Sequence, residues 1–79
     1  MNSKIYDEWL KINVEIHNKL EKLKKLDKEK DNLIKEAENK GLTEEIKVSM
    51  NRSVSKYNLL LEEIKVLNVR SKELNEKIN

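Results

Sequence analysis

The sequence predicts an all-α protein, an antiparallel two-helix coiled-coil hairpin that dimerises into a four-helix bundle. Apolar residues recur at alternating spacings of three and four residues in both halves of the chain, which is the period of a helix and not of a strand. The 79 residues contain one Gly and no Pro, so most of the chain can lie in a few long helices. Charged residues make up 41% of the sequence and the apolar residues are mostly Leu and Ile, as in long helices and coiled coils.

The first predicted helix covers residues ~3–40, and either Asn2 or Ser3 can cap its start. Heptad positions a and d form one stripe along this helix, in which Lys19 and Lys30 replace apolar residues. We assign position a to Trp9, Ile16, Leu23, Lys30 and Ala37, and position d to Ile5, Ile12, Lys19, Leu26 and Leu33. A stripe sustained over about five heptads indicates a coiled-coil-like seam.

The turn is predicted at Gly41-Leu42-Thr43. Gly41 can adopt the left-handed backbone conformation that ends a helix. Thr43 can cap the following helix, which places Glu44 and Glu45 in its positively polarised first turn. We therefore expect the chain to reverse its direction here.

The second predicted helix covers residues ~43–78 and repeats the stripe. The two helices together form a single domain over residues 1–79, a length near the lower limit for a chain that must bury its own core. Position a holds Met50, Tyr57, Ile64, Ser71 and Ile78, and position d holds Ile46, Ser53, Leu60, Leu67 and Leu74.

Charges at heptad position g favour a hairpin over one continuous rod. In an antiparallel pair, the g positions of the two helices face each other, and a fold at Gly41 brings opposite charges together at four of five levels. Exposed pairs of this kind contribute about 0.2–1 kcal/mol each, so their main effect is to set register. The predicted pairs are Glu8–Lys77, Glu15–Arg70, Lys22–Glu63 and Glu29–Lys56, while Glu36 faces the uncharged Ser49.

The e flank of the hairpin is apolar and predicts a homodimer. A two-helix hairpin cannot cover both its seam and this flank, whereas a second hairpin in a four-helix bundle covers both. A further ridge on the second helix and a short outer stripe of Leu10 and Val14 are also apolar, although singly exposed apolar residues are ordinary. An isolated hairpin, a larger oligomer and a hetero-complex are the alternatives. The flank contains Tyr6, Leu20, Ile34, Val54 and Leu61, with Leu20 expected to face Leu61, and the ridge contains Leu59 and Val66.

Polar residues occupy four seam positions: Lys19, Lys30, Ser53 and Ser71. They could fix the register or the choice of partner. The favoured interpretation is simpler: each Lys extends along the groove with its ammonium group in water, and each Ser supplies a small side chain opposite a larger one.

No residue pattern points to catalysis, a metal or a cofactor. His17 is the single histidine and falls at the outward position b, and the chain has no Cys, so zinc and thiolate sites have no basis. One Gly cannot build a phosphate-binding loop. We therefore expect a protein that is not an enzyme and has no small-molecule substrate.

Nucleic-acid binding is the weaker alternative for the basic stretch around Lys24, Lys25 and Lys28. Glu21 and Asp31 share this surface, no aromatic residue lies among the lysines, and the net charge is only +2. A solvated helix face is the favoured interpretation.

The segment from Asp31 to Leu60 resembles the small helical-hairpin aspartyl-phosphate phosphatases that act on sporulation response regulators. The shared part is Leu33-Ile34-Lys35-Glu36-Ala37 followed by Lys40-Gly41-Leu42-Thr43. The resemblance implies a helix, a Gly-containing turn and a second helix, often in a dimer. That family carries Ser-Gln-Glu-Leu-Asp on its second helix, where this chain has Asn51-Arg52-Ser53-Val54-Ser55, so the activity is not carried over.

These observations predict a non-catalytic helical interaction protein, such as a small regulator, adaptor or inhibitor. The abundance of Lys, Asn and Ile suggests an AT-rich coding source, and we expect a bacterial or phage origin. The first residues contain no apolar stretch like that of a secretory signal, and no apolar run approaches the ~20 residues that span a bilayer. We therefore expect a soluble, cytoplasmic protein whose partners are a second copy of itself and another protein, which it contacts through Leu59, Val66 and the nearby Asn58, Glu62 and Arg70.

Overall fold

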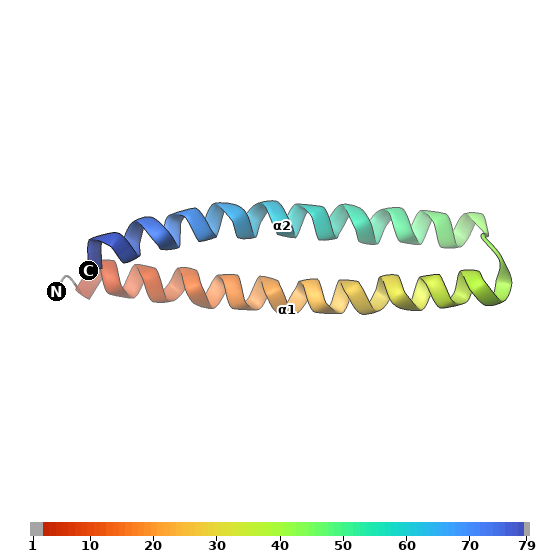
Figure 1. Ribbon diagram of the computed structural model, residues 1–79, viewed down its shortest axis with the longest axis horizontal. Coiled ribbons are helices and arrows are strands. Elements are labelled where there is room, and N and C mark those ends of the chain that lie inside the picture. Colours follow the sequence, from red (N-terminus) through yellow and green to blue (C-terminus); the bar gives the residue numbers. More distant parts are fainter. Residues whose placement is uncertain (1–2, 79) are drawn as a thin grey trace.

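The computed structural model describes residues 3–78, which form two long α-helices lying side by side in opposite directions (Figure 1). α1 spans Ser3–Lys40 and α2 spans Glu44–Ile78. Together they form a rod with extents of 59 × 15 × 14 Å. The prediction of an all-helical protein with two helices is confirmed. Asn2, one of the two predicted caps of the first helix, lies outside the described residues.

The turn between the helices follows from three residues. Gly41 has a φ of 84°, in the left-handed region, and its N–H donates to the carbonyl of Ala37 at 2.9 Å, which closes the last turn of α1. Thr43 then caps α2, because its Oγ1 accepts a hydrogen bond of 3.2 Å from the N–H of Ile46. Glu44 and Glu45 occupy the first turn of α2, where carboxylates interact favourably with the helix dipole. The chain therefore stops and restarts its helix at the residues that the sequence indicates.

The seam between α1 and α2 coincides with the assigned heptad positions. Every a and d position of both helices is buried or half-buried. Leu74 is the most deeply buried of them, with 1% of its surface exposed. The buried apolar side chains of the described residues are few, namely Leu23, Leu26, Ile46, Ile64 and Leu74. A pair of helices alone thus protects only a narrow strip of apolar surface from water.

Three of the four polar seam residues contact the opposite helix, namely Lys19, Lys30 and Ser71. Lys19 reaches Glu63 on α2 with an Nζ–Oε2 distance of 2.6 Å. The Nζ of Lys30 lies 4.0 Å from the ring centroid of Tyr57, a cation–π contact between the helices. Ser71 Oγ accepts a hydrogen bond of 3.1 Å from the side-chain amide of Asn13. These contacts go beyond the expected extension of each Lys into water, since both ammonium groups bind the opposite helix.

The four predicted g–g ion pairs are wrong as contacts. Within residues 3–78 the ion pairs that join the two helices are instead Lys19–Glu63 and Arg70–Glu8, the latter with an Nη2–Oε1 distance of 3.0 Å. Lys19 lies at position d, beside the g position of the opposite helix, so it reaches Glu63 in place of Lys22. Arg70 is long enough to extend past the level of Glu15 to Glu8.

The predicted register is nevertheless present in the packing. The a residue Ala37 and the d residue Ile46, expected at one level, line the same hollow, as do Leu33 and Met50. On the g side, Glu36 and Ser49 also share a hollow. The heptad pattern therefore placed the helices correctly along each other, although it did not identify which charged side chains meet.

Candidate interaction site

The apolar flank, which we define as Tyr6, Leu20, Ile34, Val54 and Leu61, runs along one side of the hairpin. These residues occupy the e positions of both helices, and the e positions adjoin in an antiparallel pair. Their exposed fractions lie between 36% for Leu61 and 48% for Ile34. Each side chain is thus partly packed on the seam and still presents a large part of its surface to water, as expected for residues that a further layer could cover.

Leu20 and Leu61 lie at the centre of this flank. Leu20 is close to the midpoint of α1, and Leu61 is close to the midpoint of α2. The predicted register places them at one level, opposite each other across the hairpin. The two Leu side chains of the flank therefore lie at the level about which a second rod of equal length could overlap it fully.

Asn13 lies on the same side of the hairpin as the flank, between this centre and the open end, and its side chain is hydrogen-bonded to both helices. Its Nδ2 donates to the carbonyl of Trp9 at 2.8 Å and to Ser71 Oγ at 3.1 Å. Its side chain is therefore fixed against both helices. Nothing in the sequence pattern alone indicated this contact, because an Asn at an e position is ordinarily an exposed polar residue.

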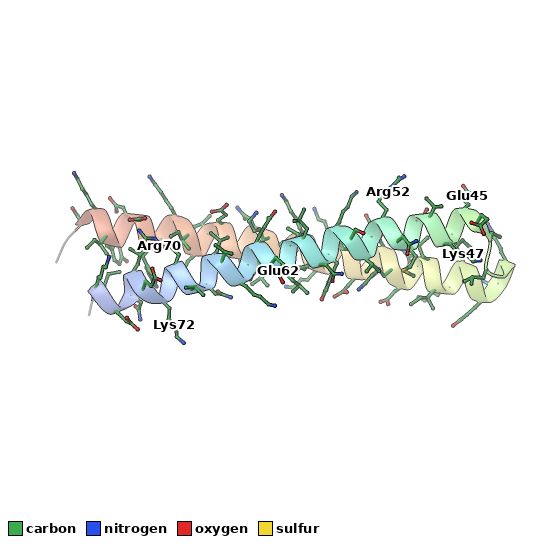
Figure 2. All side chains as sticks on the ribbon, turned by 90° about the horizontal axis from the view of Figure 1, so that it is seen from above. Glu45, Lys47, Arg52, Glu62, Arg70 and Lys72 are labelled. Carbon is green, nitrogen blue, oxygen red and sulfur yellow. The ribbon has the colours of Figure 1, made fainter. Side chains whose placement is uncertain are left out.

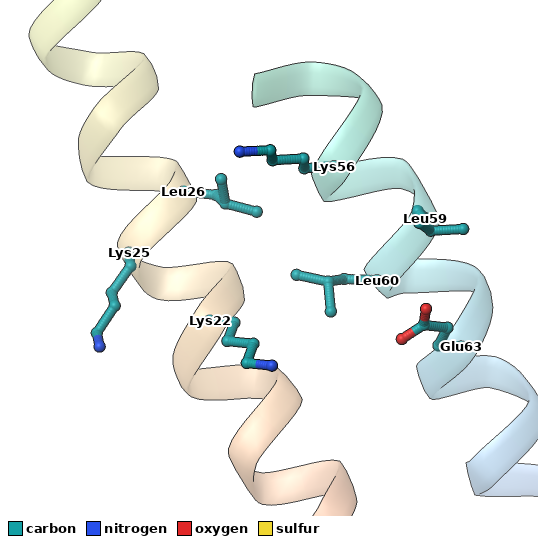
Figure 3. A pocket seen from close by; sticks show the side chains of 7 residues that line it. All are labelled: Lys22, Lys25, Leu26, Lys56, Leu59, Leu60 and Glu63. Atoms are coloured by element: carbon teal, nitrogen blue, oxygen red, sulfur yellow. The ribbon is translucent and has the colours of Figure 1, made fainter. Parts of the chain in front are cut away.

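A hollow, which we call the basic groove, lies on the g side of the hairpin, opposite the apolar flank (Figure 3). It has a volume of about 320 Å³, and its surface is almost entirely apolar between the charged groups of its rim. The residues that line it are Lys22, Lys25, Leu26, Lys56, Leu59, Leu60 and Glu63. Leu59, which the sequence pattern singled out, projects beside it with 62% of its surface exposed.

The charge around the basic groove is unbalanced. Glu63 is the single carboxylate of its rim, and Lys19 already binds that carboxylate at 2.6 Å. Among residues 3–78, no ion pair involves Lys22, Lys25 or Lys56. The lining thus contains three lysines outside any ion pair of the described residues; Lys22 and Lys56 extend into the space between the helices, whereas Lys25 extends away from it (Figure 3). The predicted Lys22–Glu63 and Glu29–Lys56 pairs would have neutralised two of the three.

Val66 lies in a neighbouring, shallower hollow together with Glu15, Lys19, Glu63 and Leu67. Its exposed fraction is 69%, so it packs on little of the hairpin itself. Leu59 and Val66 both lie on the g side of α2, one heptad apart, and form the ridge that the sequence predicted. Charged side chains project from α2 along the whole length of the rod, as the labelled Glu45, Lys47, Arg52, Glu62, Arg70 and Lys72 show (Figure 2).

Two basic groups have perturbed acidity because each binds a carboxylate of the other helix. The hydrogen bond from Lys19 to Glu63 raises the pKa of Lys19 above its ordinary value. The hydrogen bond from Arg70 to Glu8 likewise raises the pKa of Arg70, with Glu73 contributing further. Both shifts favour the charged form and are consistent with pairs that hold the helices together.

The remaining predicted positions are spread over the outer surface. His17 is exposed on α1, and Lys24 of the basic stretch pairs with Glu21 at 3.3 Å. At the place of the phosphatase motif, Asn51 and Arg52 are exposed while Ser53 is buried in the seam. Within the described part of the chain, no cluster of His, Cys, Asp and Glu could hold a metal ion. Neither described helix contains a stretch long and apolar enough to cross a membrane.

No protein family, curated protein or solved structure matches this chain.

Proposed function

We propose that this protein is a non-catalytic helical interaction module, a small regulator or adaptor that acts by holding other protein chains. The observation that carries the proposal is the contrast between the narrow buried seam and the apolar flank beside it. Few side chains are fully buried in the hairpin, whereas Leu20, Ile34 and Leu61 remain between a third and a half exposed. Covering such a surface with another protein removes apolar side chains from water and so stabilises the complex.

The occupant of the apolar flank is a second copy of the chain. Burying a Leu or Ile side chain completely contributes about 1.5–3 kcal/mol, and the flank residues have a third to a half of that burial still to gain. Since both copies contribute the flank, the gain is doubled in a homodimer. A face 59 Å long and 15 Å wide corresponds to about 900 Å², close to the ~800 Å² per partner of a standard stable interface.

The basic groove and the Leu59–Val66 ridge form the contact site for the other protein. The groove offers an apolar floor, and its lining includes three lysines that form no ion pair within residues 3–78. The complementary partner is an amphipathic helix with an apolar side chain flanked by Asp or Glu. The two surfaces lie on opposite flanks of the hairpin, so both can be occupied at once.

The dimer is tested by measuring molar mass in solution, by light scattering coupled to size-exclusion chromatography, for the wild type and two variants. Leu20→Glu with Leu61→Glu places carboxylates in the centre of the flank, and we expect this variant to be monomeric and less helical. Val14→Glu is the matched control, because Val14 is an exposed residue at the outward position f. A wild type of monomer mass at micromolar concentration would overturn the proposal, as would a double variant that still dimerises.

A further inference from the structure

We propose that two copies pair face to face through the apolar flank and run in opposite directions, with Leu20 and Leu61 at the two-fold axis. This inference rests on the proposed function, because it requires the flank to hold a second copy. It adds the orientation of that copy and the residues that specify it.

The e positions of the two helices, which contain the apolar flank and the polar residues between its members, have a fixed order along the rod. The register that packs Ala37 with Ile46 and Leu33 with Met50 places one e residue of each helix at every level. The hydrogen bond between Asn13 and Ser71 agrees with the same register near the open end. From the turn to the open end the levels are Ile34 with Lys47, Asp27 with Val54, Leu20 with Leu61, Asn13 with Asn68, and Tyr6 with Asn75.

Two arrangements bring the flanks of two identical hairpins together with full overlap and closed symmetry. In one, the two-fold axis runs along the rods, both turns lie at the same end, and α1 of each copy faces α2 of the other. In the second, the axis crosses the rods, the turns lie at opposite ends, and α1 faces α1 while α2 faces α2. The residues that meet differ completely between the two arrangements.

The antiparallel arrangement brings charged residues against amides. With the axis at Leu20, the two flank positions on either side of it meet, so Asp27 faces Asn13 of the second copy. By the same symmetry about Leu61, Lys47 faces Asn75 of the second copy. Both charged groups already have a partner on their own helix, Lys30 for Asp27 at 3.4 Å and Glu44 for Lys47 at 3.5 Å. A neighbouring amide then completes a polar environment at each end of the apolar centre.

The same arrangement brings apolar residues against apolar residues. Leu20 meets Leu20 and Leu61 meets Leu61 at the axis, and Ile34 meets Tyr6 of the second copy on either side. The ring of Tyr6 lies 5.9 Å from that of Trp9, centroid to centroid, so Ile34 would pack on an aromatic pair. The one mismatch among the levels is Val54 opposite Asn68.

The parallel arrangement keeps Leu20 against Leu61 and Asn13 against Asn68, but it mismatches the other three levels. It places Asp27 against Val54, Lys47 against Ile34 and Tyr6 against Asn75. Removing a carboxylate and an ammonium group from water beside aliphatic side chains is unfavourable unless polar groups replace that water. The order of side chains at the e positions therefore favours antiparallel pairing in two ways. It matches the residues that meet in the antiparallel dimer, and it makes the parallel dimer unfavourable.

An axis at Leu20 and Leu61 also gives the interface its largest area. α1 runs from Ser3 to Lys40 and α2 from Glu44 to Ile78, so Leu20 and Leu61 lie near the middle of each helix. An axis at this level lets the two rods overlap over nearly their whole length. A shift by one heptad would expose the ends of both copies and lose part of an interface that is close to the standard area only at full overlap.

The absence of Cys from the chain makes the orientation measurable, because a single introduced Cys is a unique attachment point. Lys47→Cys carrying a nitroxide spin label lies 14 residues from Leu61, or about 21 Å along the helix at 1.5 Å per residue. Pulsed dipolar spectroscopy on the dimer is expected to give a distance of about 42 Å between the two labels of an antiparallel dimer. Labels of a parallel dimer would lie at one level, within roughly 25 Å of each other, since adjacent helices pack ~10 Å apart.

Mixing two labelled variants provides the complementary reading. Asn75→Cys lies 14 residues on the other side of Leu61, so it faces Lys47→Cys across an antiparallel interface. Equal mixtures of the two labelled proteins are expected to show a new short distance, absent from either protein alone. The molar mass of each labelled protein is measured on the same sample. A dimer with a short Lys47→Cys distance and no new distance in the mixture overturns the orientation alone, whereas monomers overturn the proposed function with it.

Discussion

Lys19 and Glu63 join the two helices through an Nζ–Oε2 contact of 2.6 Å at the middle of the hairpin. The Lys belongs to the seam and the Glu to its g edge, so the contact closes one side of the seam and also occupies the single carboxylate on the rim of the basic groove. One ion pair thus links the stability of the hairpin to the charge of a candidate binding surface.

We expect Glu63→Gln to lower the melting temperature of the hairpin, because Lys19 then loses its charged partner across the helices. The pKa of Lys19 is raised by this partner above its ordinary value of 10.5. The stabilisation is therefore fully present below that pH and is lost as the pH rises through the higher pKa of the folded state. Circular dichroism melts between pH 7 and 11 should show a constant difference from the wild type that shrinks in the most alkaline samples.

Glu62→Gln is the matched control for this pair, because Glu62 contacts Lys65 at 3.5 Å on one exposed helix face. It should change the melting temperature little at any pH. The exchanged variant, Lys19→Glu with Glu63→Lys, should recover most of the loss. If the exchanged variant is no more stable than Glu63→Gln, the two side chains do not interact in solution.

Gly41→Ala is expected to destabilise the hairpin by about 1–2 kcal/mol, the cost of a left-handed conformation for a residue with a Cβ. A Cβ at Gly41 would meet no atom within 4 Å, so the effect is one of backbone conformation and not of a clash. Gly41→Asn should cost less, because Asn adopts this conformation more readily. Urea unfolding at one fixed protein concentration measures both variants, and equal costs for Ala and Asn would contradict the assignment.

Leu74→Ala should destabilise the protein by about 2–5 kcal/mol, the range for truncating a buried Leu. Leu74 is 1% exposed and lies in the seam close to the open end, where no turn connects the helices. Val69→Ala is the control, since Val69 is an exposed residue of the same helix and its truncation should change stability by less than about 0.5 kcal/mol. Similar unfolding midpoints for the two variants would mean that the ends of the helices are frayed.

The sequence was sufficient for the helices, the turn and the register because each depends on local or periodic signals. The seam follows from a repeat that both helices share, and Gly41 and Thr43 act within a few residues of themselves. The ion pairs could not be predicted in the same way, because they depend on side-chain length and direction: Arg70 reaches Glu8, one heptad beyond its expected partner. The unbalanced charge of the basic groove was missed for the same reason. The sequence predicted that Lys22 pairs with Glu63 and Lys56 with Glu29, and neither pair forms.

The basic groove should prefer acidic over basic amphipathic helices. Two synthetic helical peptides with the same Leu positions, one flanked by Glu and the other by Lys, serve as probes in fluorescence anisotropy titrations. We expect the acidic peptide to bind about tenfold more tightly at low salt, because contacts with three lysines at about 0.2–1 kcal/mol each sum to about 0.6–3 kcal/mol, a range that includes the 1.4 kcal/mol of a tenfold difference. The preference should weaken as salt screens the charges.

Charge reversal at the rim separates this recognition from adhesion to any apolar surface. The double variant Lys22→Glu with Lys56→Glu should bind the basic peptide more tightly than the acidic one. Leu59→Ala should weaken the binding of both peptides, because it removes apolar contact area without changing the charge. Reversal at Lys24 and Lys28, which project from α1 outside the groove, is the matched control with the same change in net charge. If the control variant reverses the preference equally, the peptides respond to overall charge and the groove is not their binding site.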